Sequence, residues 1–196
     1  NIYFVHFLDN SSYSNASNAS HIDGTARKSG DDQFSFPVGA NSNLQLISIS
    51  APSQTTDHFA AYYKNVDPSN FGYSTVAIDS NCGGSPVVVD VSEKEYWVLQ
   101  QTGGSSAVEV TLNYDASSDL SLPANVMVAT WDGSAWSSLG NGGNTGSSSN
   151  GSVVTGDGCG FAGSAQTTNQ FGIFGFCASN LSALPVELLS FAAKKI

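Results

Sequence analysis

Residues 95–115 read EYWVLQQTGGSSAVEVTLNYD, and this stretch decides the fold that the sequence predicts. Residues 96–102 are a run of aromatic, β-branched and amide side chains, of which the first two kinds favour strands. Residues 103–106 (GGSS) are turn formers, because glycine tolerates a positive φ. From residue 108 to 115 apolar and polar residues alternate, which places one apolar face inward. We therefore predict an antiparallel hairpin at the centre of an all-β domain.

The composition is that of a folded protein with few charges. The chain has 196 residues, enough for one large or two small β-domains, and 40% of them are hydrophobic, enough to bury a core. Only 11% are charged, so Ser, Thr, Asn and Gly carry the surface. This pattern is typical of extracellular β-proteins.

The charge balance excludes some partners. The net charge is −10, with six basic residues, so no basic patch is available to neutralise phosphates and we expect no nucleic-acid partner. An anionic membrane surface is disfavoured for the same reason. No apolar run has the length of a membrane-spanning helix, so we expect no membrane insertion. The first residues resemble neither a translation start nor a signal peptide, which favours a processed or excised chain.

Strand-like runs recur along the chain, and none predicts a helix. This cadence predicts an antiparallel β-sandwich, jelly-roll-like in type. Residues 140–151 (GNGGNTGSSSNG) are expected to form a surface loop, and turns are expected at residues 23–24 and 30–32. The predicted strands cover residues 2–8, 34–36, 44–50, 55–64, 74–79, 86–91, 125–131, 136–139, 152–155, 170–177 and 184–191.

The first strand is the most hydrophobic run of the chain. Residues 2–8 (IYFVHFL) are apolar on both faces apart from His6, so another layer or another molecule must cover them. We divide the chain into an N-terminal strand and polar linker (1–19), a β-sandwich domain (20–183) and a C-terminal strand or linker (184–196). One interpretation of residues 2–8 is an ordinary interior strand. The other interpretation is that residues 2–8 form an arm that completes a neighbour's sheet. Its interface would be Ile2, Phe4, Val5, Phe7 and Leu8.

Three cysteines are present, at Cys82, Cys159 and Cys177. In an oxidising compartment we expect one disulfide and one leftover thiol, and we favour Cys159–Cys177, which would close a short Gly-rich loop. Three buried thiols are the alternative. The spacing fits no zinc pattern.

Residues that could support catalysis or bind a ligand are few. Glycan hydrolysis needs two carboxylates across a cleft, and a Ser-His-Asp triad needs an oriented histidine. Neither arrangement is predicted, and His6, His21 and His58 are expected to be structural or surface residues.

We expect no cofactor, with calcium possible at Asp31 and Asp32. Trp131 and Trp136, together with Trp97, could form a platform for a sugar ring, although pairing across a hairpin end above the core is the favoured interpretation.

Several segments together resemble a known but uncharacterised module. They are HIDGTARKSGDDQFSFPVG, ISAPSQTTDHFAAYY, EYWVLQQT, VEVTLNYD, VMVATWDGSAWSSLG and LPVELLSF, spanning residues 20–191. The pattern resembles a β-rich module of secreted and cell-surface proteins of the Bacteroidetes that leave the cell through the type IX secretion system. The resemblance implies secretion, a β-rich fold and an extracellular role, and it implies no catalytic residue. Residues 82–91 and the apolar start depart from it.

These observations favour a non-enzymatic, secreted structural protein at the cell surface. We expect a self-assembling subunit of an extracellular fibre, surface layer or adhesive appendage, which forms a filament by donating a strand to its neighbour. Residues 184–191 could be the complementary joint. The alternative is a carbohydrate-binding accessory module that recognises extracellular glycans through Trp131 and Trp136.

Overall fold

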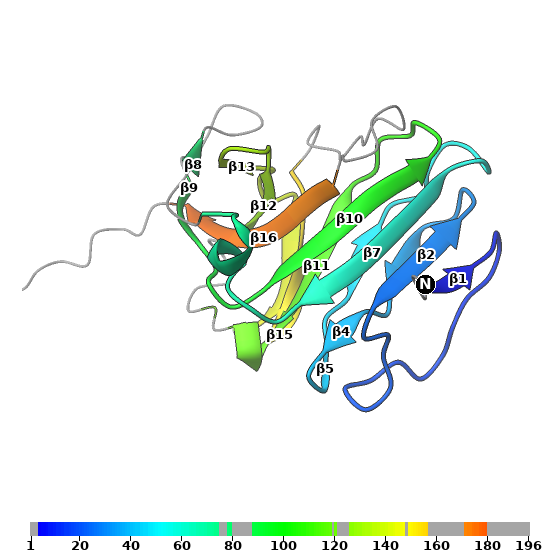
Figure 1. Cartoon of the computed structure of the whole chain (residues 1–196), viewed down its shortest axis with the longest axis horizontal. Coiled ribbons are helices and arrows are strands. Elements are labelled where there is room, and N and C mark those ends of the chain that lie inside the picture. Colours follow the sequence, from blue (N-terminus) through cyan, green and yellow to red (C-terminus); the bar gives the residue numbers. More distant parts are fainter. Residues whose placement is uncertain are drawn as a thin grey trace, which may run out of the picture.

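The computed structural model of the chain describes residues 4–74, 78–79, 88–118, 120, 126–147, 149–156 and 171–179. Within these residues the protein is all-β, and its only helical elements are two short 3-10 helices, η1 (Pro68–Phe71) and η2 (Ala116–Ser118). Two large sheets face each other (Figure 1). The predicted fold class, an all-β sandwich, is confirmed.

The larger sheet has nine strands. Its order is β1-β2-β7-β10-β16-β12-β13-β8, and β9 also pairs with β16. Among the described strands of this sheet, pairing is parallel only for β1 with β2 and for β13 with β8. The strands are β1 (Phe4–Phe7), β2 (Thr25–Ser29), β7 (His58–Lys64), β8 (Ile78–Asp79), β9 (Val88–Val91), β10 (Tyr96–Gly103), β12 (Val126–Trp131), β13 (Trp136–Ser138) and β16 (Phe171–Ser179).

The second sheet has five strands in the order β14-β15-β11-β6-β3. They are β3 (Phe34–Phe36), β6 (Ile47–Ile49), β11 (Val110–Asp115), β14 (Gly143–Ser147) and β15 (Asn150–Val154). A small hairpin of β4 (Gly39–Ala40) and β5 (Asn43–Leu44) stands apart. Asn41 and Ser42 connect its strands, both with positive φ (54° and 63°), as a type I′ turn requires.

The central hairpin predicted for residues 95–115 is wrong. Both halves are strands, but β10 belongs to the nine-stranded sheet and β11 to the five-stranded sheet, so the GGSS segment crosses between sheets. The buried carboxylate of Asp57 holds this crossover. Its Oδ1 accepts hydrogen bonds from the backbone N–H groups of Ser105 (2.9 Å) and Ser106 (3.3 Å), and its Oδ2 accepts one from the Ser106 hydroxyl.

The structure differs from the predicted strands in three further places. β14 lies within the predicted loop 140–151, because its backbone pairs with β15 although all its side chains are exposed. β2 was expected only as sequence between two turns. The run 44–50 is two strands, β5 and β6, separated at Gln45, whose N–H donates to the carbonyl of Val38 (2.9 Å).

The main core lies between the two sheets. It is built from every second residue of its strands, as in β11, where buried and partly buried positions alternate. Its largest fully buried side chains include Trp97, Tyr114 and Phe36. A second cluster covers part of the opposite face of the nine-stranded sheet and contains Tyr96, Val98, Met127, Ala129 and Trp136. The second hairpin of the prediction, β12 with β13, is confirmed and borders this cluster.

Candidate functional site

The N-terminal strand β1 lies at the free edge of the nine-stranded sheet (Figure 1). It pairs in parallel with β2, with Phe4 opposite Thr25 and Phe7 opposite Lys28. The sequence predicted that both faces of this strand are covered. In the structure Phe4, Val5 and Leu8 are exposed, with 43%, 46% and 62% of their surface accessible. Ile2, the remaining residue of the predicted interface, lies outside the described residues. The structure therefore leaves apolar surface and an unpaired strand edge at this end of the sheet.

On the inner side, one residue attaches the strand to the core. The ring of Phe7 lies between those of Tyr13 and Phe34, with centroid distances of 5.8 Å and 4.9 Å. Phe34 is 7% exposed and belongs to the main core. Since Tyr13 also contacts Phe34 (5.8 Å), the three rings form one aromatic cluster at the sheet edge. We call residues 4–13 the arm, and the surface of β2 and β3 that contacts it the slot.

At the end of β1, a buried lysine binds the arm backbone. Lys28 is 1% exposed, and its Nζ donates to the carbonyl of Leu8 (2.9 Å), the carbonyl of Ser29 (2.9 Å) and Oδ2 of Asp32 (2.8 Å). Asp32 also accepts a hydrogen bond from the N–H of Asn10 (2.8 Å). The hydrogen bond from Lys28 lowers the pKa of Asp32 most, and the hydrogen bond from Asn10 lowers it further. The ammonium and carboxylate thus bind the two polar groups of the arm where the ladder stops.

Two histidines meet on the outer face of the same sheet. Nε2 of His6, on the arm, lies 2.7 Å from the hydroxyl oxygen of Ser29, and Nδ1 of His58, on β7, lies 2.6 Å from that oxygen. Desolvation and then the charges of Arg27, His58 and Lys28 lower the pKa of His6. The guanidinium of Arg27 lies over the Phe4 ring at 4.4 Å from its centroid. The sequence predicted only isolated histidines, because nothing in it revealed that β1 and β7 flank β2.

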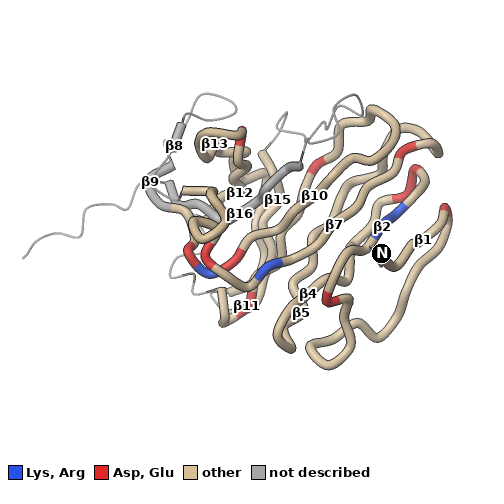
Figure 2. Tube along the Cα trace, in the orientation of Figure 1, with Lys and Arg blue, Asp and Glu red and all other residues tan. Residues whose placement is uncertain are grey.

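The calcium candidates Asp31 and Asp32 are joined in space by Asp9. One carboxylate oxygen from each lies within 4.8 Å of the others. Figure 2 shows acidic segments near the ends of β1 and β2, close to the basic segment of β2. Asp32 is already paired with Lys28, so a calcium ion would compete with an ammonium for this carboxylate. Calcium binding here stays a prediction.

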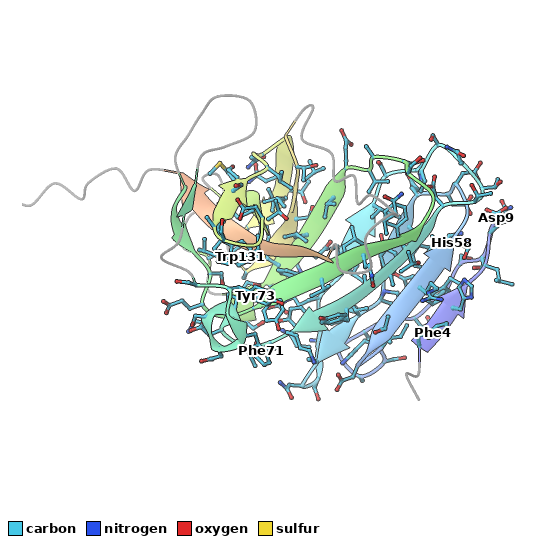
Figure 3. The ribbon with its side chains drawn as sticks, turned by 45° about the horizontal axis from the view of Figure 1, so that its top comes forward. Phe4, Asp9, His58, Phe71, Tyr73 and Trp131 are labelled. Carbon is cyan, nitrogen blue, oxygen red and sulfur yellow. The ribbon has the colours of Figure 1, made fainter. Side chains whose placement is uncertain are left out.

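An aromatic array lies towards the other end of the nine-stranded sheet, and Figure 3 labels three of its members, Phe71, Tyr73 and Trp131. Trp131 and Trp136 face each other across the hairpin, with ring centroids 5.7 Å apart. Trp136 has no exposed surface, so it supports its neighbours and cannot itself stack on a sugar ring. Trp97 is buried in the main core, where its Nε1–H donates to the carbonyl of Gln45 (3.2 Å). The favoured interpretation of the tryptophan pair, a cross-strand contact over the core, agrees with this geometry.

Sequence reasoning missed the outer members of the array. Tyr73 contacts both Trp131 (5.9 Å) and the buried Tyr96 (5.5 Å), and Phe71, which is 56% exposed, contacts Tyr96 at 6.0 Å. Phe71 ends the 3-10 helix η1, which begins where Asp67 accepts a hydrogen bond from the N–H of Ser69. The sequence DPSN at residues 67–70 could have predicted the start of this helix, because Asp is a common N-cap and Pro is common at the first helical position.

One carboxyl group is buried without a basic partner. Glu95 is 1% exposed, and the hydroxyl of Tyr63 donates to its Oε2 at 2.5 Å. Desolvation by burial raises the pKa of Glu95 to about 7. The charge of Asp115 also raises this pKa, whereas the hydrogen bonds from Ser118 and Tyr63 lower it. No described cleft reaches it, so we assign it to the stability of the fold.

The disulfide prediction lies largely outside the described residues. Cys159 and Cys82 are not described, and Cys177 is described only as a backbone position of β16, opposite Met127 and Val91. The pairing of Cys159 with Cys177 therefore stays a prediction.

Comparisons with known proteins give no relative. No family model, no curated protein and no solved structure matches the chain. In the part of the chain that the structure describes, no helix is long and apolar enough to cross a membrane.

Proposed function

We propose that this protein is a non-enzymatic, secreted structural subunit of an extracellular fibre, surface layer or adhesive appendage. Its subunits join by β-strand addition, with the arm of one subunit in the slot of the next. The observation that carries the proposal is that β1 is a separable edge strand. It adds to the sheet in parallel, and it contacts the edge of β2, the Phe34 ring and Lys28.

A short polar hinge would let the arm reach a neighbouring subunit. Tyr13 packs on Phe7 and would move with it, so the hinge falls in residues 14–20 (SNASNAS). Few described contacts attach this hinge to the domain: Asn18 accepts a hydrogen bond from the N–H of Leu44, and Nδ1 of His21 lies 3.3 Å from the carbonyl oxygen of Ser17. Ser17 and Ser20 bridge each other within the hinge. Extended, this hinge spans about 23 Å, enough to reach an adjacent copy. Exchange of an identical element replaces each intramolecular contact by the same intermolecular one.

The geometry of exchange favours a chain of subunits. The arm and the slot are different surfaces, so each subunit gives one and accepts one, and such a head-to-tail contact is open-ended unless the rotation closes a ring. Exposed Phe4, Val5 and Leu8 would become part of a larger contact between subunits. The low charge and the resemblance of residues 20–191 to secreted modules support the extracellular location.

The test compares the full chain with a variant that lacks residues 1–10, by sedimentation velocity over a wide concentration range. We expect larger species to grow with concentration in the full chain, and to be lost in the deletion variant and in the presence of excess peptide 1–10. Phe7→Ser should abolish assembly, whereas Val66→Ser, at an exposed position outside the arm, should not. A full chain that stays monomeric at every concentration would refute the proposal.

A second candidate function is glycan binding at the aromatic array. The observation that favours it is the exposure of Phe71 above the buried ring of Tyr96, beside Tyr73 and Trp131, because sugar C–H groups stack on aromatic faces. The test is tryptophan fluorescence during titration with polysaccharides. Binding would give a saturable change that Trp131→Phe reduces and Phe71→Ala weakens. No change with any polysaccharide would exclude this candidate.

A further inference from the structure

We propose that the bridge from His6 through Ser29 to His58 makes docking of the arm proton-dependent, so that mild acid releases it. The release itself needs only the geometry of one subunit. Its consequence, that mild acid also weakens the joint between subunits, rests on the proposed function.

The bridge has one hydroxyl proton for two imidazoles. With both rings neutral, the Ser29 hydroxyl donates to one ring nitrogen and accepts a hydrogen bond from the N–H of the other, so all three groups are paired. Both nitrogens lie close to the same oxygen, and therefore within about 5 Å of each other. When His6 is protonated, its Nε2 can only donate to the Ser29 oxygen, so the hydroxyl must donate to His58. The bridge then has a single arrangement of its protons, and the new positive charge lies near the guanidinium of Arg27.

The surroundings make protonation of the docked His6 harder. β2 contributes Arg27 and Lys28, and β7 contributes His58, which follows Asp57. Of the acids nearby, Asp32 is paired with Lys28, and Asp57 accepts hydrogen bonds from Ser105 and Ser106. Asp9 and Asp31 lie with Asp32 past the end of β1. Among the described residues no carboxylate forms an ion pair with Arg27, so its charge acts on His6 without compensation.

The direction of the pH effect follows from these contacts. Docking lowers the pKa of His6 below its ordinary value of 6.5, which a released arm regains, so protons bind the released arm better. Docking is therefore strongest above pH 6.5 and weakens as the pH falls below it. Uptake of one proton weakens docking by up to about tenfold per pH unit, until the docked His6 itself is protonated.

Another titration in this range acts in the opposite direction. Glu95, with a pKa of about 7, is protonated in acid, and burial favours that form, so acid stabilises the body of the domain. It contacts Tyr63, which is five residues along β7 from His58, or about 17 Å. Loss of the arm in acid would therefore not be a sign of general unfolding.

The experiment follows the backbone amide signals of Val5 and Phe7 by NMR in the full chain, from pH 8 to pH 5, at a concentration where it is monomeric. We expect docked signals at pH 8 and a released population that grows by up to about tenfold per pH unit below 6.5. His6→Gln, which can still hydrogen bond to Ser29 but does not titrate, should flatten this profile. Glu95→Gln, which removes the other group that titrates in this range, should keep it.

The outcomes separate this inference from the proposed function. A docked arm at all pH values, a released arm at pH 8, or the same profile in wild type and His6→Gln would each overturn the inference. Acid release without any larger species at high concentration would uphold the inference and refute the proposed function. Assembly that does not depend on pH would do the reverse.

Discussion

The ring of Phe7 on β1 lies 4.9 Å from the ring of Phe34 on β3, so the residue that anchors the arm contacts the core through the opposite sheet. Phe7→Ala should release the arm and leave the sandwich folded. We expect a cost of about 2 kcal/mol, below that of a fully buried phenylalanine because Phe7 is only partly buried. Urea unfolding and the amide signals of β1 measure it. Phe4→Ala, whose ring contacts Arg27 on the outer face, is the control, with an expected loss of about 0.5–1 kcal/mol. Equal effects would contradict this assignment of the anchor.

Glu95 predicts a pH dependence of stability. Burial raises its pKa from 4.5 to about 7, so the folded state holds a proton that the unfolded state loses first. The free energy of unfolding should therefore fall between pH 4.5 and pH 7, by about 3 kcal/mol, and then level off as far as this residue is concerned. Glu95→Gln should remove this slope in urea titrations at several pH values, whereas exposed Glu93→Gln should keep it. The same slope in Glu95→Gln would show that another group is responsible.

The crossover between the sheets predicts a position-specific cost for alanine. Gly104 has φ +79°, and a Cβ there would overlap the carboxylate of Asp57. Gly133 also has positive φ (+110°), but a Cβ there meets nothing within 4 Å. Gly133→Ala should cost about 1–2 kcal/mol from backbone strain alone, and Gly104→Ala clearly more, because it also displaces Asp57. Thermal unfolding of both variants measures the difference. Equal costs would mean that Asp57 does not hold the crossover.

The two tryptophans of the β12–β13 hairpin should differ in their contribution to stability. Trp136 has no exposed surface, so Trp136→Ala should cost about 3–5 kcal/mol. Trp131 is partly buried at the edge of the same cluster, so Trp131→Ala should cost less, about 1–2 kcal/mol. Chemical denaturation checks both values. A larger loss for Trp131 would contradict the assignment of Trp136 as the supporting ring.

The sequence predicted the elements better than their pairing. Alternation in residues 108–115 predicts a strand wherever that strand pairs, and β11 has that pattern. Whether β10 pairs with β11 or crosses to the other sheet depends on Asp57, more than forty residues earlier in the chain, which takes the hydrogen bonds of the GGSS turn. β14 was missed because its exposed, small and polar side chains give no periodic signal.

The candidate site shows the same limit. Residues 2–8 were predicted as an unusual apolar strand, and the exposed positions of β1 agree with that. Lys28 and Ser29, which bind it, come from β2, and His58, which contacts Ser29, comes from β7. Only the order β1-β2-β7 brings these groups together. Asp31 and Asp32 were selected as acidic turn residues, but their neighbours Asp9 and Lys28 required the fold.

The most direct test of the central claim, assembly by exchange of the arm, is electron microscopy of the concentrated full chain beside the variant without residues 1–10. Exchange of the arm between subunits predicts regular filaments or layers for the full chain and dispersed particles for the deletion variant. The circular dichroism of the deletion variant should still be that of a β-protein. Dispersed single particles in both samples, or equal assemblies in both, would contradict it.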